Sequence, residues 1–410
     1  MTLIGNLGIS RDGGVVVGNT SGTTQSEAFR WTRQSGVELL GFLPGGTYSR
    51  ANATSWDGGI VVGVCTVSGP IWEAFVWSES GGMVGIGFLA GRTWSGATGV
   101  SGDGLVVVGA AANGTYLEAF RWTATTGLVG LGGLGTDSRA QATNADGSVV
   151  VGGVHVSGVE HPARWTQQTG MVSLGLPPWA TSAVAWDVSA DGNVLVGESS
   201  GTREAFKWTP GTGYVGLGDL PGGPFSSAAY GVSDSGSVIV GEGRTASASE
   251  AVFWAPTSQG PISVKAHLTS LGVTTHKNWV LYRAQSVSAD GLRIVGQGQN
   301  PFGQNQAWMA ILPAPWEPYC TAKVNSLGCT PAISGEGVPS ATNVWSFEVA
   351  AVNVRNQKAG VFIYKVGGTQ NAQPFQGGTL CIGPTGIRRT IGVNSGGNPA
   401  PADDCSGVYS

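Results

Sequence analysis

Short apolar runs alternate with glycine-bearing turns along the first 313 residues. A turn containing Asp-Gly or Ser-Gly is followed by a β-branched run in seven places: "SRDGGVVVG" at 10–18, "SWDGGIVVG" at 55–63, "SGDGLVVVG" at 101–109, "NADGSVVVG" at 144–152, "SADGNVLVG" at 189–197, "SDSGSVIVG" at 233–241 and "SADGLRIVG" at 288–296. Runs of this kind are typical of strands buried on both faces. Gly supplies the positive φ of a tight turn. The pattern predicts seven hairpins.

A second apolar phrase keeps step with the first. It reads "EAFRW" at 27–31, "EAFVW" at 73–77, "EAFRW" at 118–122 and "EAFKW" at 204–208, with changed copies "HPARW" at 161–165, "EAVFW" at 250–254 and "QAWMA" at 306–310. Alternation along a strand places Phe and Trp on one face and Ala on the other. We expect the aromatic face to wedge between neighbouring units, and the recurring Glu to tie to a backbone turn or an adjacent Arg.

Each unit thus contains four predicted strands, the last resembling "YVGLGDL" at 214–220. Four short strands at a period of 40–50 residues are typical of a β-propeller. We therefore predict an all-β fold, with a seven-bladed β-propeller over residues 1–313. An insertion at 261–279 contains "VKAHLTSLG", which favours one or two helical turns. The seventh unit ends after its third strand. A strand from the N-terminus could complete this blade, but Met1–Gly5 leaves little chain before "NLGIS", so we expect that strand to be short or missing.

The pattern changes after residue 313. Residues 314–319 form a predicted linker, and 320–410 a small β domain whose abrupt end leads us to expect truncation. Four of the five cysteines lie in this segment: Cys320, Cys329, Cys381 and Cys405. An even set in a short segment predicts disulfides, with three pairings open. The fifth, Cys65, follows an apolar run and is predicted to be a buried thiol.

Composition narrows the class of protein. The chain has 69 Gly, 11% charged residues and a net charge of −4, without the basic stripe that nucleic acid or an anionic membrane requires. No apolar run approaches the length of a membrane-spanning helix. The first ten residues lack the features of a signal peptide. The predicted disulfides nevertheless favour an oxidising compartment, so we expect a processed protein that is extracellular or on the cell surface.

The repeat resembles the HAF-repeat family of bacterial extracellular proteins. The phrases that carry the resemblance are "SADG", "VVVG", "EAF" with its Trp, "GLGDLPGG" and "SAAYGVS", and they cover about residues 1–313. The segment "YCTAKVNSLGCTPAISGEGVPSAT" resembles a C-terminal module of secreted planctomycete and myxobacterial proteins. Both resemblances imply secretion and fold, and neither implies an established activity.

One stretch has the residue types of a metal site. In "VHVSGVEH" at 154–161, a turn at Ser157–Gly158 would place His155 across from Glu160, with His161 adjacent. Two imidazoles and a carboxylate suit a transition metal. The competing interpretation is a solvated hairpin in a variable loop. The sequence gives no motif for a cofactor, and we predict none.

A departure from the repeat supplies the candidate catalytic residue. Four positions before the turn Asp, six units have a small residue and the fifth has Asp187. A carboxylate there is either buried and paired or faces the axial channel. Alternation predicts that Asp187 shares a face with Ala185 and Ser189, while Trp186 points the other way. Trp186 and Tyr230 occupy matching places in units five and six, and both are candidate ligand-binding residues.

A set of aromatic residues also recurs in the connections between units: Tyr48, Trp94, Trp179, Phe225 and Trp279. They either stack on sugar rings or fill the space between blades.

These observations favour a binding or structural module that recognises a glycan or a surface protein, with no nucleic acid and no membrane insertion. One alternative is a polysaccharide hydrolase or lyase, which needs an acid and a base in one cleft. Asp187 is the first candidate for that role, and His155, Glu160 and Asp137 are weaker ones. Another alternative is a self-assembling surface or filament protein. The oligomeric state is left open.

Overall fold

We examined a computed structural model of the chain. It describes residues 2–21, 25–134, 136–256 and 258–313, and beyond them only the backbone of short strands between 332 and 409. Two compact units follow one another, Met1–Leu312 and Pro313–Ser410, and each is described by itself.

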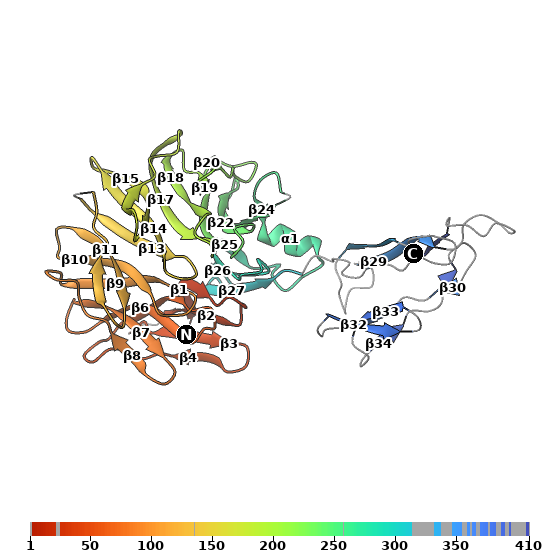
Figure 1. The fold of residues 1–410 in the computed structure, drawn as a ribbon, viewed down its shortest axis with the longest axis horizontal. Coiled ribbons are helices and arrows are strands. Elements are labelled where there is room, and N and C mark those ends of the chain that lie inside the picture. Colours follow the sequence, from red (N-terminus) through yellow and green to blue (C-terminus); the bar gives the residue numbers. More distant parts are fainter. Residues whose placement is uncertain are drawn as a thin grey trace. The chain divides into compact units, whose positions relative to one another are not determined.

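The first unit is a seven-bladed β-propeller, as predicted (Figure 1). Blades 1 to 6 are four-stranded antiparallel sheets whose strands follow chain order. Their strands are β1 (Thr2–Ile9), β2 (Val15–Ser21), β3 (Ala28–Thr32) and β4 (Gly36–Leu39); β5 (Ser49–Thr54), β6 (Ile60–Thr66), β7 (Trp72–Ser78) and β8 (Gly82–Gly85); β9 (Trp94–Val100), β10 (Val107–Ala112), β11 (Leu117–Thr123) and β12 (Gly127–Gly130); β13 (Ser138–Thr143), β14 (Val149–Val156), β15 (Val159–Thr166) and β16 (Gly170–Ser173); β17 (Ala180–Val188), β18 (Leu195–Gly201), β19 (Ala205–Thr209) and β20 (Gly213–Gly216); and β21 (Ala228–Val232), β22 (Ile239–Arg244), β23 (Ser249–Trp254) and β24 (Ile262–Ser263).

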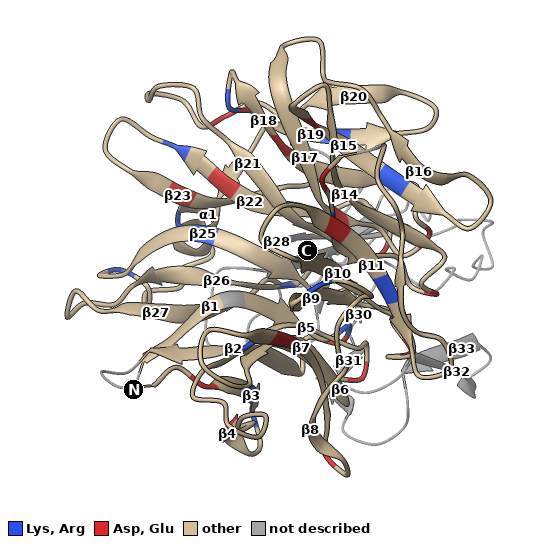
Figure 2. Ribbon diagram, turned by 90° about the vertical axis from the view of Figure 1, so that its left-hand side faces the viewer, with Lys and Arg blue, Asp and Glu red and all other residues tan. Residues whose placement is uncertain are grey.

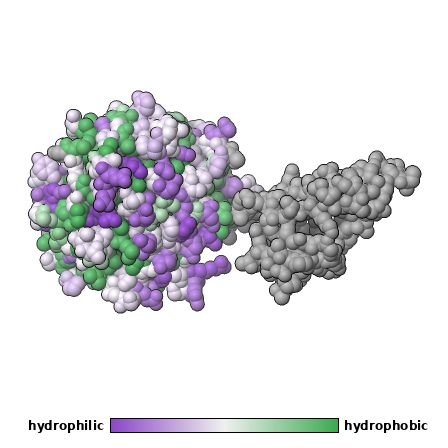
Figure 3. Space-filling model, in the orientation of Figure 1, coloured by the Kyte–Doolittle hydropathy of each residue, from purple (hydrophilic) through white to green (hydrophobic). Residues whose placement is uncertain are grey.

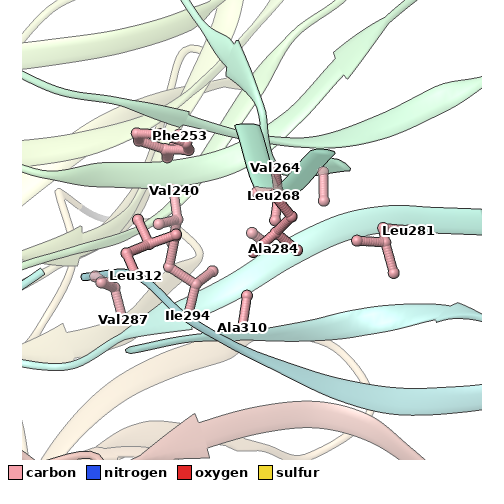
Figure 4. Close-up of a cluster of buried hydrophobic side chains, with 11 residues drawn as sticks. Val240, Phe253, Val264, Leu268, Leu281, Ala284, Val287, Ile294, Ala310 and Leu312 are labelled. Carbon is pink, nitrogen blue, oxygen red and sulfur yellow. The ribbon is translucent and has the colours of Figure 1, made fainter. Parts of the chain in front are cut away.

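Blade 7 has three strands among the described residues: β25 (Val280–Val287), β26 (Arg293–Gln299) and β27 (Asn305–Ile311). The insertion before it forms the predicted helix α1 (Val264–Ser270), capped by the Ser263 side chain, which accepts a hydrogen bond from the Ala266 N–H. Val264 and Leu268 of α1 enter a buried cluster with Phe253 of blade 6 and Ile294 of blade 7 (Figure 4). The helix therefore packs at the junction between the last two blades.

The five-residue repeat packs the blades against one another, as expected. Phe29, Phe75, Phe120 and Phe206 have no exposed surface. Phe75 shares a buried cluster with Ala28 of the preceding blade, and Phe120 shares one with Ala74. Phe75 and Phe120 thus face the preceding blade, because the small Ala of that blade leaves room for the ring.

The recurring Glu is a structural tie, also as expected. The Glu27 carboxylate accepts a hydrogen bond from the Gly41 N–H at 2.9 Å, and Glu73 accepts one from Gly87 at 2.8 Å. Glu118 instead pairs with Arg92 at 2.8 Å. The bonds of Glu27 and Glu73 hold the loop after the fourth strand of their own blade near its third strand, whereas the pair of Glu118 with Arg92 joins blades 2 and 3.

The turns between the first and second strands share one hydrogen-bonding pattern. In blade 1 the Ser10 hydroxyl donates to Asp12 Oδ1 at 2.7 Å and accepts from the Val15 N–H at 2.9 Å. Gly13 has φ of 67°, the left-handed conformation that favours glycine. The same Ser–Asp pair closes the turns that contain Asp57, Asp103, Asp191 and Asp290.

Cys65, the absence of a membrane-spanning helix and the surface hydropathy (Figure 3) bear on the remaining predictions for the described residues of the propeller. Cys65 is a buried free thiol, as expected, and burial raises its pKa. In the described part of the chain, no helix has the length and hydropathy needed to span a membrane. Figure 3 shows hydrophilic and hydrophobic residues interspersed over the propeller face in view.

The second unit has short antiparallel strands: β28 (Ala332–Gly337), β29 (Phe347–Val354), β30 (Ala359–Gly360), β31 (Ile363–Lys365), β32 (Gln370–Phe375), β33 (Gly378–Ile382), β34 (Ile387–Arg389), β35 (Val393–Asn394) and β36 (Gly407–Tyr409). β28, β29 and β36 form one sheet. The disulfides predicted among Cys320, Cys329, Cys381 and Cys405 fall on side chains outside those that the structure describes.

Candidate functional site

The first strands of all seven blades surround a cavity of about 480 Å³ on the propeller axis. In Figure 2, the inner strands β1, β5, β9 and β25 lie toward the centre, and the short outer strands β4, β8, β16 and β20 lie at the periphery. The volume falls within the range of about 300–1,000 Å³ that is usual for small-molecule sites. This cavity is the candidate site.

A β-bulge in each inner strand turns one extra side chain toward the axis. In β13, for example, Ala140 and Ala142 pair with consecutive residues of β14, and Gln141 between them is left unpaired. The same one-residue shift occurs in the inner strands of blades 2 to 7, and in β1 a larger irregularity places residues 5–7 opposite Gly18. We call the cavity-lining side chains at these shifts the bulge residues: Leu7, Asn52, Thr98, Gln141, Trp186, Tyr230 and Gln285. A bulge re-aims a side chain in this way because the inserted residue interrupts the alternation of the strand.

Among the described residues, six backbone hydrogen bonds, which join all neighbouring blades except 6 and 7, form an open ring at the end of the cavity where the inner strands turn back. Each bond joins the residue after the turn Ser or Asn to its equivalent in a neighbouring blade. The N–H to carbonyl pairs are Arg11 to Trp56 (3.0 Å), Trp56 to Gly102 (3.0 Å), Gly102 to Ala145 (2.8 Å), Ala145 to Ala190 (3.2 Å), Ala190 to Asp234 (3.1 Å) and Ala289 to Arg11 (2.9 Å). Blade 7 is thereby joined to blade 1, and the propeller closes.

Two side chains lie across this ring. Arg11 Nε is 2.8 Å from Asp234 Oδ2, and the Arg11 guanidinium sits 4.0 Å from the centroid of the Trp56 ring. Gly102 is required beneath Trp56, because a Cβ there would lie 2.5 Å from the indole. The ion pair joins blades 1 and 6, which are not neighbours in the ring.

Asp187 lies in the wall of the cavity and also bonds to the next blade. Its Oδ1 accepts from the Val188 N–H at 2.8 Å, and its Oδ2 accepts from the Val232 N–H at 2.9 Å. Burial raises the pKa of Asp187 to about 7, although both backbone N–H groups act in the opposite sense, and nearby Asp234 adds to the rise. The sequence left open whether Asp187 is buried and paired or faces the axial channel. In the structure it does both.

The predicted orientation of Trp186 is wrong. Alternation placed it on the face opposite Asp187, but the bulge between Ala185 and Asp187 lets both side chains line the cavity. Trp186 and Tyr230 meet edge to face with ring centroids 6.3 Å apart. The sequence identified both residues correctly as occupying matching places, since both are bulge residues.

A network of charges fixes this aromatic pair. Trp186 Nε1 donates to Glu198 at 3.1 Å, and Arg203 donates to the Tyr230 hydroxyl at 3.0 Å. Arg203 also lies 2.9 Å from the Glu198 carboxylate and 2.7 Å from the buried Glu242 carboxylate. Although burial acts to lower it, Tyr230 and the two carboxylates raise the pKa of Arg203. The aromatic wall is thus held by bonds that span two blades.

Several polar atoms of the cavity wall lack a partner within the described residues. They are Asn52 Oδ1, Gln285 Oε1 and Arg50 Nε, all shielded from solvent. Asn52 uses its amide N–H to donate to the Ala97 carbonyl at 2.7 Å, which orients the side chain. Buried polar groups are rarely left unsatisfied, so these atoms are suited to bind a polar ligand.

The other predicted aromatic residues lie outside the cavity lining. Tyr48 packs edge to face on Trp72 with centroids 4.9 Å apart, and Trp179 Nε1 bonds to Ser199 at 3.2 Å. Trp94 begins β9 and lies against Gly96, and Trp279 packs on the cluster around α1. Phe225 is 50% exposed. The structure therefore brings Trp186 and Tyr230 together and leaves these five apart from them.

The predicted metal site is not assembled. His155 and Glu160 face each other across the hairpin, as expected, but successive strand residues point to opposite faces, so His161 lies on the other side. Glu160 bonds to Arg139 at 2.6 Å and His161 to Ser173 at 3.0 Å. No group of three or more His, Cys, Asp or Glu suited to a metal lies among the described residues. Asp137 binds the Leu117 N–H at 3.0 Å and lies outside the cavity lining.

Sequence reasoning missed most of the site. Asn52, Thr98, Gln141 and Gln285 stand three positions before the turn Ser or Asn, in the same register as Trp186 and Tyr230. This column holds six residue types at seven positions, and its variability was the available signal. Glu198, Arg203 and Glu242 carried no such signal, because they lie on second strands and connections.

Comparisons with known proteins support the fold. No family model matches the chain, and a search of curated proteins finds no similar sequence. Among solved structures, an oligogalacturonate lyase from Vibrio parahaemolyticus has a TM-score of 0.52 and 12% identity, over 76% of this chain and 91% of that protein. An oligogalacturonate lyase in complex with manganese has a TM-score of 0.50 and 14% identity, over 74% and 88%. TolB from Acinetobacter baumannii has a TM-score of 0.42 and 14% identity over 60% of this chain and 62% of its own, so this chain spans less than two thirds of that protein. At these identities the likeness shows the fold alone.

Proposed function

We propose that this chain is a binding module, extracellular or on the cell surface, whose axial cavity holds a glycan. The observation that carries the proposal is the ring of bulge residues, which places one side chain from each blade on the cavity wall, with six residue types at seven positions. Repeated positions build the blades, whereas the bulge residues differ in chemistry around the axis. A position freed from the repeat in this way suits recognition better than folding. The HAF-repeat resemblance supports the location.

The residue types favour a saccharide over an apolar ligand. Amides at Asn52, Gln141 and Gln285 and the hydroxyl of Thr98 suit the donors and acceptors of sugar hydroxyls. Trp186 offers a flat apolar surface for the C–H face of a pyranose ring, and Glu198 fixes its indole. A protein partner would bury a broad surface, whereas these groups converge on a cavity of about 480 Å³.

A polysaccharide hydrolase or lyase is the second candidate, and one observation favours it. The pKa of Asp187, about 7, is near the value that a general acid or base needs at neutral pH. Against it, both Asp187 oxygens already accept backbone hydrogen bonds, and Glu198 and Asp234 are paired with Arg203 and Arg11. A reducing-end assay on a polysaccharide panel, with Asp187→Asn as the inactive control, separates catalysis from binding.

A glycan array probed with the full chain tests the proposal, followed by calorimetric titration of the saccharide that binds best. Trp186→Ala removes the stacking surface and should weaken binding roughly tenfold or more, about 1.4 kcal/mol. The matched control is Trp179→Ala, a partly buried Trp of the same blade outside the cavity lining, which should leave the affinity unchanged. Equal affinity in wild type and Trp186→Ala would place the ligand elsewhere and overturn the proposal.

A further inference from the structure

Three arginines occupy the same register on the inner strands. Arg50, Arg139 and Arg283 each stand two residues before a bulge residue. Arg139 binds Glu160 at 2.6 Å, and Arg283 lies 3.5 Å from Glu242. Within the part of the chain that the structure describes, Arg50 has neither a hydrogen-bond nor an ion-pair partner, and its Nε is shielded from solvent. One of three equivalent cations is therefore unneutralised.

The difference has a local cause. In blade 4, Glu160 pairs with His155, the residue that follows Val154, which in turn pairs with Ser138 beside Arg139. In blade 2 the equivalent residues are Ser49, which precedes Arg50 and pairs with Cys65, and Thr66, which follows Cys65 and pairs with Trp72. An aromatic ring thus stands where blade 4 has its carboxylate. Trp72 packs edge to face on Tyr48 and offers Arg50 no negative charge.

The remaining charges of the cavity wall are already paired. Arg11 is paired with Asp234 and Glu198 with Arg203, while Asp187 accepts two backbone N–H groups. Arg283, also in the lining, lies 3.5 Å from Glu242, so Arg50 is the one charged residue of the described lining with neither an ion-pair partner nor a hydrogen bond. The Arg50 Nε is shielded from solvent without a partner, which is unfavourable for a polar group, and the planar fork of a guanidinium matches a carboxylate.

Position around the axis links Arg50 to the aromatic wall. Blade 2 carries Arg50, and in a ring of seven the blades farthest from it are 5 and 6, which carry Trp186 and Tyr230. We infer that the ligand of the axial cavity is an acidic saccharide, whose carboxylate binds Arg50 while a sugar ring stacks on Trp186 across the axis. This inference rests on the proposed function and names its ligand class.

The experiment compares uronate-containing and neutral saccharides on one array, using the full chain. Uronate-containing saccharides should give the strongest signals. The best of them, with its neutral counterpart as a reference, is then titrated by calorimetry. Arg50→Gln removes the charge and should weaken the uronate roughly 10-fold to 100-fold, as for loss of a charge-assisted hydrogen bond, and should leave the neutral saccharide within about twofold.

Arg139→Gln is the matched control, since it removes an arginine at the same register that lies outside the cavity lining. It should leave uronate affinity unchanged. Arg50→Lys keeps the charge but loses the bidentate fork, so it should give an intermediate loss and supplies the test if Arg50→Gln fails to fold.

Four outcomes overturn the inference. Binding confined to neutral saccharides, with Trp186→Ala still weakening it, removes the carboxylate and retains the proposed function. A uronate affinity that Arg50→Gln leaves unchanged also rules out the contact between Arg50 and the carboxylate and retains the proposed function. Preference for sulfated or phosphorylated saccharides, or for a peptide C-terminus, assigns Arg50 another anion. Binding of no glycan at all overturns both this inference and the proposed function.

Discussion

Asp187 accepts a hydrogen bond from the backbone N–H of Val232 at 2.9 Å and so joins the inner strands of two neighbouring blades. In other blades the position equivalent to Asp187 holds a small residue, and there the backbones of neighbouring inner strands lie close together. A Cβ on Gly99 would lie 3.1 Å from the Ala142 Cα, and one on Gly231 would lie 3.2 Å from the Ser286 Cα. Blade 5 replaces this close contact by a carboxylate, which explains how an acid fits in a column of small residues.

Asp187 should make stability depend on pH. Its pKa is raised from 3.8 to about 7, so the folded state binds more protons than the unfolded state between these values. The stabilisation is fully present below pH 3.8 and is lost as pH rises through 7, by roughly 2–4 kcal/mol. Urea unfolding of wild type and Asp187→Asn at pH 5 and pH 8 measures this. Wild type should lose stability between the two values, and the variant should lose less.

Asp191→Asn is the control for that comparison. Asp191 is an exposed turn residue of the same blade, and the Ser189 hydroxyl, then the Asn193 N–H, lower its pKa. Its contribution is complete above pH 3.8, so the variant should keep the wild-type difference between pH 5 and pH 8. An Asp187→Asn variant that also kept the full difference would show that another group carries it.

The fold could be predicted because it is written seven times. A single blade offers short, ambiguous strands, but "VVVG" and "EAFRW" recurring in step left few architectures compatible with burying both faces. The departures from the regular repeat could also be predicted from the sequence. The phrase "VKAHLTSLG" predicted α1, and the missing phrase after "QAWMAILP" predicted a seventh blade with three described strands.

The site was harder to predict because no residue type marks a bulge, and only a comparison of all seven units shows that this column varies. Perfect alternation sent Trp186 away from Asp187, and one extra residue in the ladder brings both to the axis. The pairing of Glu160 with Arg139 depends on register between three strands, which spacing along the chain does not supply. His161 fell on the wrong face for the simpler reason that it is one residue from Glu160.

Removing the buried phenyl rings should destabilise the propeller more than removing the neighbouring indoles. Phe120 has no exposed surface, whereas Trp122 is partly buried at the edge of the same cluster. Phe120→Ala should therefore lower the free energy of unfolding by about 3–5 kcal/mol, and Trp122→Ala by less. Denaturant unfolding ranks the two. Val84→Ala, at a position that is 56% exposed, is the control and should change stability by at most about 0.5 kcal/mol. Equal losses for Phe120 and Val84 would contradict the packing between blades.

The contribution of the turn aspartates to folding stability should change with pH in the opposite direction from that of Asp187. The Ser55 hydroxyl, then the Gly59 N–H, lower the pKa of Asp57 below 3.8. A lowered acid pKa gives stability that is present above pH 3.8 and is lost as pH falls through the folded value. Because Asp57 is exposed, the effect of Asp57→Ala at pH 7 should stay below about 1 kcal/mol.

Asp57→Ser tests the mechanism, because Ser235 already holds this slot in blade 6 and bonds its hydroxyl to Ser237 at 2.7 Å. The Ser variant should recover part of the stability lost in Asp57→Ala at pH 7, since a hydroxyl can accept the hydrogen bond that the carboxylate received from the Gly59 N–H. Neither variant retains a carboxylate at this position, so both should lose less stability than wild type between pH 4 and pH 2. Thermal unfolding followed by circular dichroism at these pH values measures both effects. Parallel acid sensitivity in wild type and both variants would show that the turn carboxylate does not contribute through its ionised form.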